Sequence, residues 1–221
     1  MSDRRKRLLL AAVTGLLAFW AIGLVALADR EEHDADNGFA IVQGDRSPFR
    51  GGTLPDGVAG APAPRFALAD ARGGRVDTER LQGQPYVVTF LYVNCKDVCP
   101  LIAIELKQAL EQLGSRGDEV TVLAVSADPE GDTRPAVRRW LQKLRMPDNF
   151  HYLVGTAKQL QPVWRDHYAA PQPRGNPNSA HSASIWLVDR KGRWRTKFSG
   201  GVPVAPADIA HDLRLLLDEP A

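Results

Sequence analysis

The sequence predicts an α/β domain with a mixed central sheet flanked by helices, preceded by an N-terminal transmembrane helix. Three observations lead to this prediction. Residues 86–93 (YVVTFLYV) and 119–126 (EVTVLAVS) are continuous β-branched and apolar runs, typical of central strands buried on both faces. Amphipathic stretches of helical length alternate with these strands, as in α/β folds. Residues 8–28 carry no charged side chain.

The uncharged run is long enough to cross a membrane. At about 1.5 Å per residue it covers a hydrocarbon core of about 30 Å. The cations before it (Arg4 to Arg7) favour the cytoplasmic side, which places the remaining chain outside the cytoplasm. We therefore expect residues 1–28 to be a basic stub and a retained, single-pass anchor in a bacterial inner membrane. The domain would then lie in the periplasm. Cleavage after Ala26-Leu27-Ala28, which resembles a signal-peptidase site, is the alternative.

The chain beyond the anchor divides into two regions by composition. Residues 29–62 are rich in charge, glycine and proline, which predicts an extracytoplasmic linker before a domain of residues 63–221. Beyond residue 28 the chain has 24 basic and 25 acidic side chains. This balance removes the main driving force for nucleic-acid binding. The chain also contains no glycine-rich phosphate loop or dinucleotide fingerprint.

The elements of the domain are predicted in order. Alternating apolar residues on either side of residues 71–74 indicate a hairpin. The strand 86–93 leads into a helix over about 100–113, which Pro100 begins and Gly114 ends. The next elements are a strand at 119–126, a helix at 132–144 capped by Asp132 or Thr133, a strand at 150–154, a helix at 157–168, a loop at 171–179, a hairpin of 183–189 with 193–199, and a helix at 206–217. This order matches a thioredoxin-like fold.

The only two cysteines, Cys95 and Cys99, lie where the first buried strand meets the helix. Backbone N–H groups and the dipole at a helix N-terminus stabilise thiolates. Two thiols there can form a disulfide, exchange disulfides or bind a soft metal. A static disulfide would close a very short loop and stabilise the domain little. Functional use of the pair is therefore favoured.

A metal ion bound by two thiolates is expected to have a third ligand, and His181 is the candidate. It follows a loop rich in proline and glycine and immediately precedes the strand 183–189. In a thioredoxin-like fold that junction faces the cysteine helix. The other histidines are predicted to be solvated or structural: His33, His151, His167 and His211.

Three stretches resemble the Sco/SenC family of copper-binding, membrane-tethered assembly proteins. Residues 90–100 (FLYVNCKDVCP) resemble the family's CxxxCP motif, residues 125–141 (VSADPEGDTRPAVRRWL) its Ser-x-Asp-Pro segment, and residues 181–194 (HSASIWLVDRKGRW) its His-Ser segment. The resemblance covers roughly residues 64–217. Three motifs in the family's order make the resemblance specific, whereas a CxxxC motif alone would be weak evidence for it.

The resemblance implies a function and a ligand set. Cys95, Cys99 and His181 would bind copper, since thiolates suit Cu(I) and a neutral imidazole helps to retain Cu(II). The expected function is a copper metallochaperone that delivers copper to the binuclear copper centre of a haem-copper (cytochrome c) oxidase. Its partners would be the copper-receiving oxidase subunit, and other copper chaperones or thiol reductants.

Neighbouring residues support or depart from the family pattern. Asp97 matches the motif's acidic position, but hydrogen bonds to the turn are an equally good role for it. Asp128 and Pro129 are expected to shape the turn after a strand rather than to touch metal. Lys96 stands where many members have proline, and should lower the pKa of the thiols. Ala180 stands where an aspartate is common before His181.

Two enzymatic hypotheses compete with the copper chaperone. In a thiol-disulfide oxidoreductase, Cys95 attacks a cysteine disulfide of an oxidase subunit or another extracytoplasmic partner, Cys99 resolves the mixed disulfide, and His181 is optional. A peroxiredoxin-like peroxidase is disfavoured, because that loop usually contains a threonine. Val93 and Asn94 occupy the approach to Cys95 instead.

Overall fold

The computed structural model describes residues 47–171, 184–199 and 203–220, which form one compact unit starting at Ser47. The predicted anchor at 8–28, the predicted loop beyond residue 171 and His181 lie outside these ranges. Within them, no helix combines the length and apolar character that a membrane span requires.

The described residues contain a mixed sheet of seven strands in the order β2-β1-β5-β4-β3-β6-β7. The central strands β3, β4 and β5 are parallel, while β1 and β6 pair antiparallel with β5 and β3. Every residue of β3 is buried, as its apolar run predicts. The strands are β1 (Ala67–Asp70), β2 (Arg75–Asp77), β3 (Tyr86–Leu91), β4 (Thr121–Ser126), β5 (Phe150–Val154), β6 (Ser184–Val188) and β7 (Trp194–Ser199).

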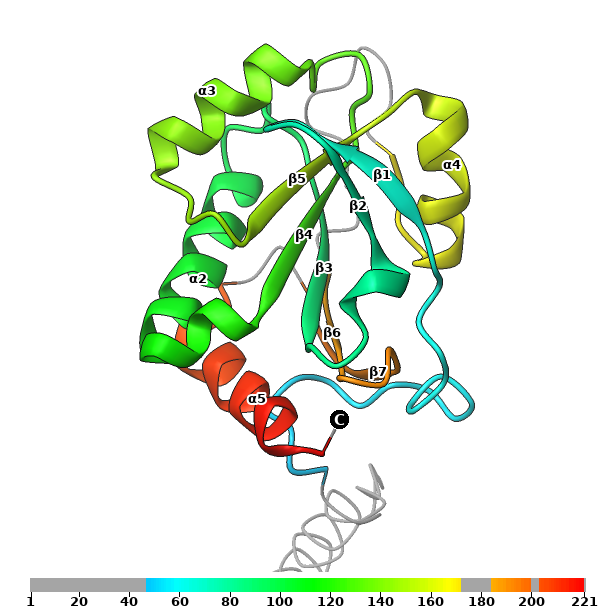
Figure 1. Cartoon of the computed structure of the whole chain (residues 1–221), viewed down its shortest axis with the longest axis vertical. Coiled ribbons are helices and arrows are strands. Elements are labelled where there is room, and N and C mark those ends of the chain that lie inside the picture. The colour runs from blue at the N-terminus through cyan, green and yellow to red at the C-terminus, as the bar shows by residue number, and fades with distance from the viewer. Residues whose placement is uncertain (1–46, 172–183, 200–202, 221) are drawn as a thin grey trace, which may run out of the picture. The chain divides into compact units, whose positions relative to one another are not determined.

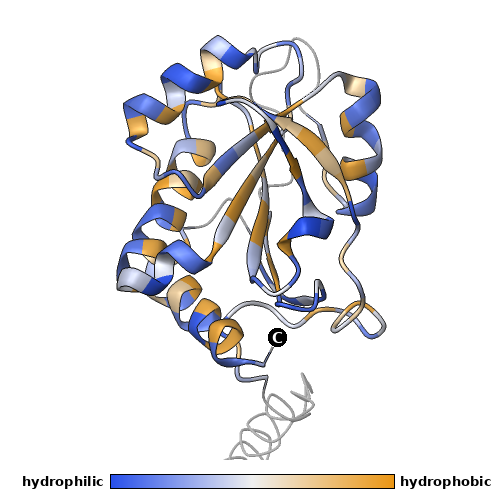
Figure 2. Cartoon of the chain, viewed as in Figure 1, coloured by the Kyte–Doolittle hydropathy of each residue, from blue (hydrophilic) through white to orange (hydrophobic). Residues whose placement is uncertain are grey.

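Helices cover both faces of the sheet (Figure 1). Buried side chains of α2, α3 and α5 share one apolar cluster, and those of α4 belong to a second cluster on the opposite face. The strands carry most of the hydrophobic colour in Figure 2. The helices are α2 (Val98–Gln112), α3 (Arg134–Leu144), α4 (Ala157–Asp166) and α5 (Pro206–Asp218), with 3-10 turns η1 (Thr78–Leu81) and η2 (Gly114–Glu119).

The predicted α/β fold with a mixed sheet is confirmed, and the arrangement is thioredoxin-like. The differences lie at the ends of elements. β3 ends at Leu91 rather than residue 93, because the Val93 N–H donates to the Asp132 carboxylate instead of to a strand. Thr133 caps α3 through the Ala136 N–H, so the alternative that Asp132 is the cap is wrong.

Part of the predicted linker packs on the domain. Gly52 pairs with Lys197 on β7, and Pro62 pairs with Arg193. Leu54 is buried in the same apolar cluster as α4. Apolar residues are sparse in residues 47–62, which is why composition alone indicated a linker throughout this stretch.

Candidate metal centre

The two cysteines are brought together by the turn between β3 and α2. The Cys95 N–H donates to the Tyr92 carbonyl at 3.2 Å, which closes the turn after the strand. Cys99 is the second residue of α2, so its N–H has no acceptor within the helix. That N–H points to the Cys95 sulfur, with an N to Sγ distance of 3.4 Å. Cys95 thus supplies the acceptor that a capping side chain normally provides.

Neither Cys95 nor Cys99 is in a disulfide, and the environments of the two thiols differ. Cys95 is partly exposed, whereas Cys99 is fully buried. A hydrogen bond from the Cys99 thiol, opposed by burial and helped by the Cys99 and Asp97 N–H groups, lowers the pKa of Cys95 to about 5. The same bond, together with burial, raises the pKa of Cys99. At neutral pH the pair therefore consists of one accessible thiolate and one buried thiol.

Tyr92 is a further contact of the accessible thiolate. Its side chain is buried and hydrogen-bonds to Cys95. Burial, and then the negative charge of Cys95, raise the pKa of Tyr92 to about 12, so the phenol remains a donor at neutral pH. Tyr92 therefore stabilises the ionised form of Cys95.

Replacing Tyr92 with phenylalanine removes this donor and should raise the pKa of Cys95 by about 1, the worth of one hydrogen bond to a charged group. The rate of Cys95 alkylation as a function of pH measures the change in the Cys99→Ala background, which leaves one thiol in the chain. Tyr86→Phe, the same change at the other end of β3, is the control. An unchanged pH profile for Tyr92→Phe would exclude Tyr92 from the site.

A buried polar network around Asp132 supports the cysteine turn. Asp132 is 3% exposed. Asp132 Oδ1 accepts from the Val93 N–H at 2.8 Å, and Oδ2 accepts from Ser126 Oγ at 2.6 Å. The Tyr152 hydroxyl lies 2.9 Å from both Asp132 Oδ2 and the Leu91 carbonyl oxygen. Asp132 thereby ties Val93, two residues before Cys95, to strands β4 and β5.

Burial, only partly offset by hydrogen bonds from Ser126, the Val93 N–H and Tyr152, raises the pKa of Asp132 to about 6. The contact with Tyr152 depends on whether Asp132 is protonated. The Tyr152 hydroxyl has one proton and two acceptors, Leu91 O and Asp132 Oδ2. When it donates to Leu91 O, Asp132 must carry a proton to complete the second contact.

The turn between β4 and α3 comes close to the cysteine turn. A Cβ atom on Gly131 would lie 2.6 Å from Asn94 Nδ2 and 2.2 Å from Asp128 Oδ2, so glycine permits the close approach. Asp128 Oδ1 accepts from the Gly131 N–H at 3.0 Å. This contact supports the prediction that Asp128 shapes the turn.

The remaining predicted residues divide into two groups. Lys96 and Asp97 are exposed beside the thiols, and the Asp97 side chain makes no capping hydrogen bond to α2. The three histidines in the described part of the chain have structural contacts: His151 Nδ1 with Asp70 at 2.6 Å, His167 Nδ1 with Val163 O at 2.9 Å, and His211 Nδ1 with Asp212 at 2.9 Å.

The described residues contain no group of three or more His, Cys, Asp or Glu arranged to hold a metal ion. His181, the predicted third ligand, lies outside them. The donors that are present suit a soft metal ion, since two sulfur atoms lie together and one is ionised at neutral pH. Cys95 and Cys99 therefore fit Cu(I) chemically.

Comparison with known proteins decides the family. The SCO1/SenC family model matches residues 58–218. The chain belongs to the SCO1/SenC family.

Curated SCO1/SenC relatives share a minority of residues with the chain. It is 22% identical over 153 residues to the SCO1 protein homolog of Bacillus subtilis, covering 67% of this chain and 79% of that protein. It is 30% identical over 131 residues to the protein SenC of Rhodobacter capsulatus, covering 57% of this chain and 58% of that protein.

Solved structures of SCO1/SenC proteins superpose on the domain. ScoI of Bradyrhizobium japonicum, determined with copper bound, superposes with a TM-score of 0.60 at 29% identity, covering 71% of this chain and 99% of that one. Apo Sco1 of Thermus thermophilus superposes with a TM-score of 0.63 at 26% identity, covering 78% and 99%. The CxxxC pair of this SCO1/SenC chain is Cys95 and Cys99.

Sequence reasoning missed two residues of this SCO1/SenC site. Tyr92 was predicted only as part of a strand, and Asp132 only as a possible helix cap. The position of Tyr92 three residues before Cys95, where a turn must bring the chain back, was the available signal. Asp132 has no comparable local signal, because its partners Val93 and Tyr152 are distant in sequence.

Proposed function

We propose that this SCO1/SenC protein is a membrane-tethered copper metallochaperone. Cys95, Cys99 and His181 bind copper and deliver it to the binuclear copper centre of a haem-copper oxidase. One observation carries the proposal: two cysteines that form no disulfide meet at the start of α2, and the partly exposed one has a lowered pKa. Family membership supports it, as does copper bound to the Bradyrhizobium relative.

The arrangement suits reversible copper binding. Thiolates hold Cu(I), and a neutral imidazole from His181 would extend the site to Cu(II). Copper binding displaces the proton of the Cys99 thiol, whose pKa is raised, so loading depends on pH. Because Cys95 is partly exposed, a recipient's ligands can approach the metal there and replace the two sulfur atoms one at a time.

The proposed location is based on the chain's N-terminal sequence. A basic stub and an uncharged run at residues 8–28 support a single-pass anchor in a bacterial inner membrane, with its N-terminus in the cytoplasm. The domain then works in the periplasm, near the membrane-embedded oxidase. Disulfides persist in that compartment, so copper loading would require a thiol reductant to keep the pair open.

The asymmetry of the thiols also favours a second function, thiol-disulfide exchange. The Cys95 thiolate attacks a partner disulfide, forms a mixed disulfide and releases one partner thiolate. Cys99 then loses its proton and attacks the Cys95 sulfur, which releases the second partner thiolate and leaves a Cys95–Cys99 disulfide. The partner gains two electrons, and an external thiol reductant must return the pair to its starting state.

One experiment separates the two functions. The copper-loaded protein is mixed with the apo copper-binding domain of the oxidase subunit in reduced form, and separately with the same domain in its disulfide form. A chaperone transfers copper to the reduced domain. If the protein is an oxidoreductase, its Cys99→Ala variant accumulates a mixed disulfide with the oxidised domain. Transfer of copper without any trapped disulfide supports the chaperone, and the reverse pattern supports the oxidoreductase.

A further inference from the structure

Helix α3 presents a strongly basic surface that the proposed copper chemistry does not use. Five exposed cationic side chains lie between residues 134 and 145, and this stretch contains no carboxylate. In Figure 2 much of α3 is coloured hydrophilic. We call this surface the α3 basic face; it consists of Arg134, Arg138, Arg139, Lys143 and Arg145.

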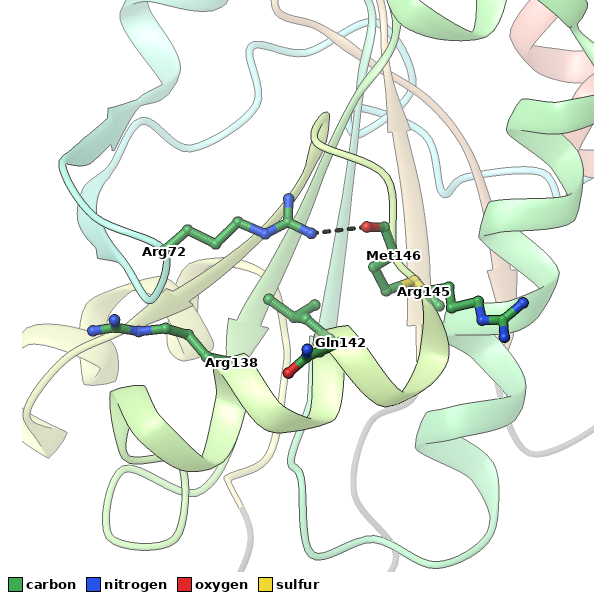
Figure 3. Close-up of a pocket in the computed structure, with 6 residues that line it drawn as sticks. Arg72, Arg138, Gln142, Arg145 and Met146 are labelled. Carbon is green, nitrogen blue, oxygen red and sulfur yellow. Dashed lines mark hydrogen bonds between the residues drawn. The ribbon is translucent and has the colours of Figure 1, made fainter.

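None of the five side chains forms an ion pair with a residue in the described ranges, although other arginines of the domain do. Arg72 shows the contrast within one pocket of about 300 Å³ that Arg138 and Arg145 also line. Its guanidinium donates to the carbonyls of Met146 and Phe150. In Figure 3, the side chains of Arg138 and Arg145 point away from each other, and no dashed line joins either of them to another residue.

The helix is poorly suited to this charge on its own. Arg134 and Arg138, and likewise Arg139 and Lys143, are like-charged pairs four residues apart, which repel on a helix surface. Arg134 is in the first turn, where the helix dipole disfavours a cation. Arg145 ends the helix with φ 53°, a left-handed conformation that glycine adopts at lower energy. Residues that conflict with local preference in this way are expected where function requires them.

The α3 basic face begins beside the cysteine turn. Gly131 lies against the Asn94 side chain, one residue before Cys95. Arg134 lines the same depression as Pro129 and Asp132, and Asp132 binds the Val93 N–H. Figure 1 shows α3 starting at the end of the sheet where β4 finishes. A molecule seated over Cys95 therefore meets the first turn of α3.

We infer that the α3 basic face docks an acidic surface of the protein that exchanges copper with Cys95. This inference rests on the proposed function, since it assigns that site's partner. A protein partner fits better than an anionic membrane, because a membrane seated over this end of the domain would cover Cys95 and block the exchange. The five cations of the α3 basic face steer an acidic partner, and the association is sensitive to salt.

The test measures association of the copper-free, reduced full chain in a nonionic detergent with the apo copper-binding domain of the oxidase subunit. For the wild type we expect the association rate to fall on the order of 10-fold between about 20 mM and about 200 mM salt. The variant Arg138→Glu/Arg139→Glu/Lys143→Glu should associate on the order of 10-fold more slowly at low salt, with little further salt dependence.

A matched control has the same change of net charge elsewhere. Arg80, Lys158 and Lys191 are exposed and lie in η1, in α4 and after β6. Their triple replacement with glutamate should stay within about twofold of the wild type at equal salt. Equal losses in both triple variants, or none in the α3 variant, would overturn the inference.

Two further measurements distinguish protein docking from membrane binding and from the proposed copper function. Binding to phosphatidylglycerol vesicles tests the membrane: loss of vesicle binding in the α3 variant, with unchanged association to the oxidase domain, would overturn the protein-docking inference. Copper titration of the same samples tests the proposed function separately. Because association is measured without copper, absence of copper binding would reject the chaperone while the salt and charge-reversal results still decide the docking surface.

Discussion

Replacing Cys95 with serine is expected to weaken Cu(I) binding by on the order of 1,000-fold, equivalent to about 4 kcal/mol. The hydroxyl that replaces the thiolate is a hard, neutral ligand with little affinity for Cu(I). Competition with a chromophoric Cu(I) chelator measures the affinity of the reduced protein. Cys99→Ser should lose a similar amount, because one thiolate and one histidine cannot replace a pair of thiolates.

Folding must be shown to be intact in these variants. Cys95 is partly exposed, so its replacement removes little core packing and costs mainly the contribution of its thiolate, whereas Cys99, on α2, is fully buried in the core. Cys99→Ala, which adds no polar atom to the core, therefore accompanies Cys99→Ser, and urea denaturation is recorded for each. Wild-type Cu(I) affinity in folded Cys95→Ser would show that copper binds elsewhere.

Asp132→Ala should destabilise the domain by about 3 kcal/mol, because it leaves the partly buried Val93 N–H without its acceptor and removes a partner of Ser126 and Tyr152. Asp132→Asn should cost less than about 1 kcal/mol. Its amide oxygen can accept from the Val93 N–H, and its NH2 group has two protons to donate to the hydroxyl oxygens of Ser126 and Tyr152. Urea denaturation at pH 7 measures both variants. A larger loss in Asn than in Ala would contradict the hydrogen-bond assignment.

The wild type and Asp132→Asn should also differ in their pH dependence. Folding raises the pKa of Asp132 from 3.8 to about 6, so the protonated form is favoured in the folded state. The resulting stability is fully present below about pH 4 and is lost as pH rises through about 6, which amounts to about 3 kcal/mol. Cys95, with a lowered pKa, acts in the opposite direction above about pH 5. The difference between wild type and Asp132→Asn cancels that contribution and isolates Asp132.

Much of the fold could be predicted because it arises from local patterns. The buried strands β3 and β4 are apolar runs, and β5 was predicted with the bounds that the structure shows. The cap Thr133 and the early proline Pro135 similarly identify the start of α3. Such signals depend on residues a few positions apart, which a single sequence displays directly.

The candidate site was predicted only in part, for a physical reason. Cys95 and Cys99 are close in sequence, and the sequence predicts that they lie where a strand meets the N-terminus of a helix. The prediction places the end of β3 at residue 93 instead of Leu91, because Asp132 and Val93, 39 residues apart, form a hydrogen bond that competes with local structure. The inequality of the two thiols also required the fold, since burial of Cys99 and the contact of Tyr92 with Cys95 are tertiary.

The most direct test of the proposed copper site is copper titration of the reduced protein beside its oxidised form and the His181→Ala variant, with optical and EPR spectra recorded. We expect one copper per reduced chain with thiolate-to-copper charge transfer, none bound tightly by the disulfide form, and weaker binding with an altered spectrum in His181→Ala. Equal copper affinity in wild type and His181→Ala would remove His181 from the site. The absence of tight copper binding by the reduced wild type, together with ready disulfide exchange, would contradict the metallochaperone and favour the oxidoreductase.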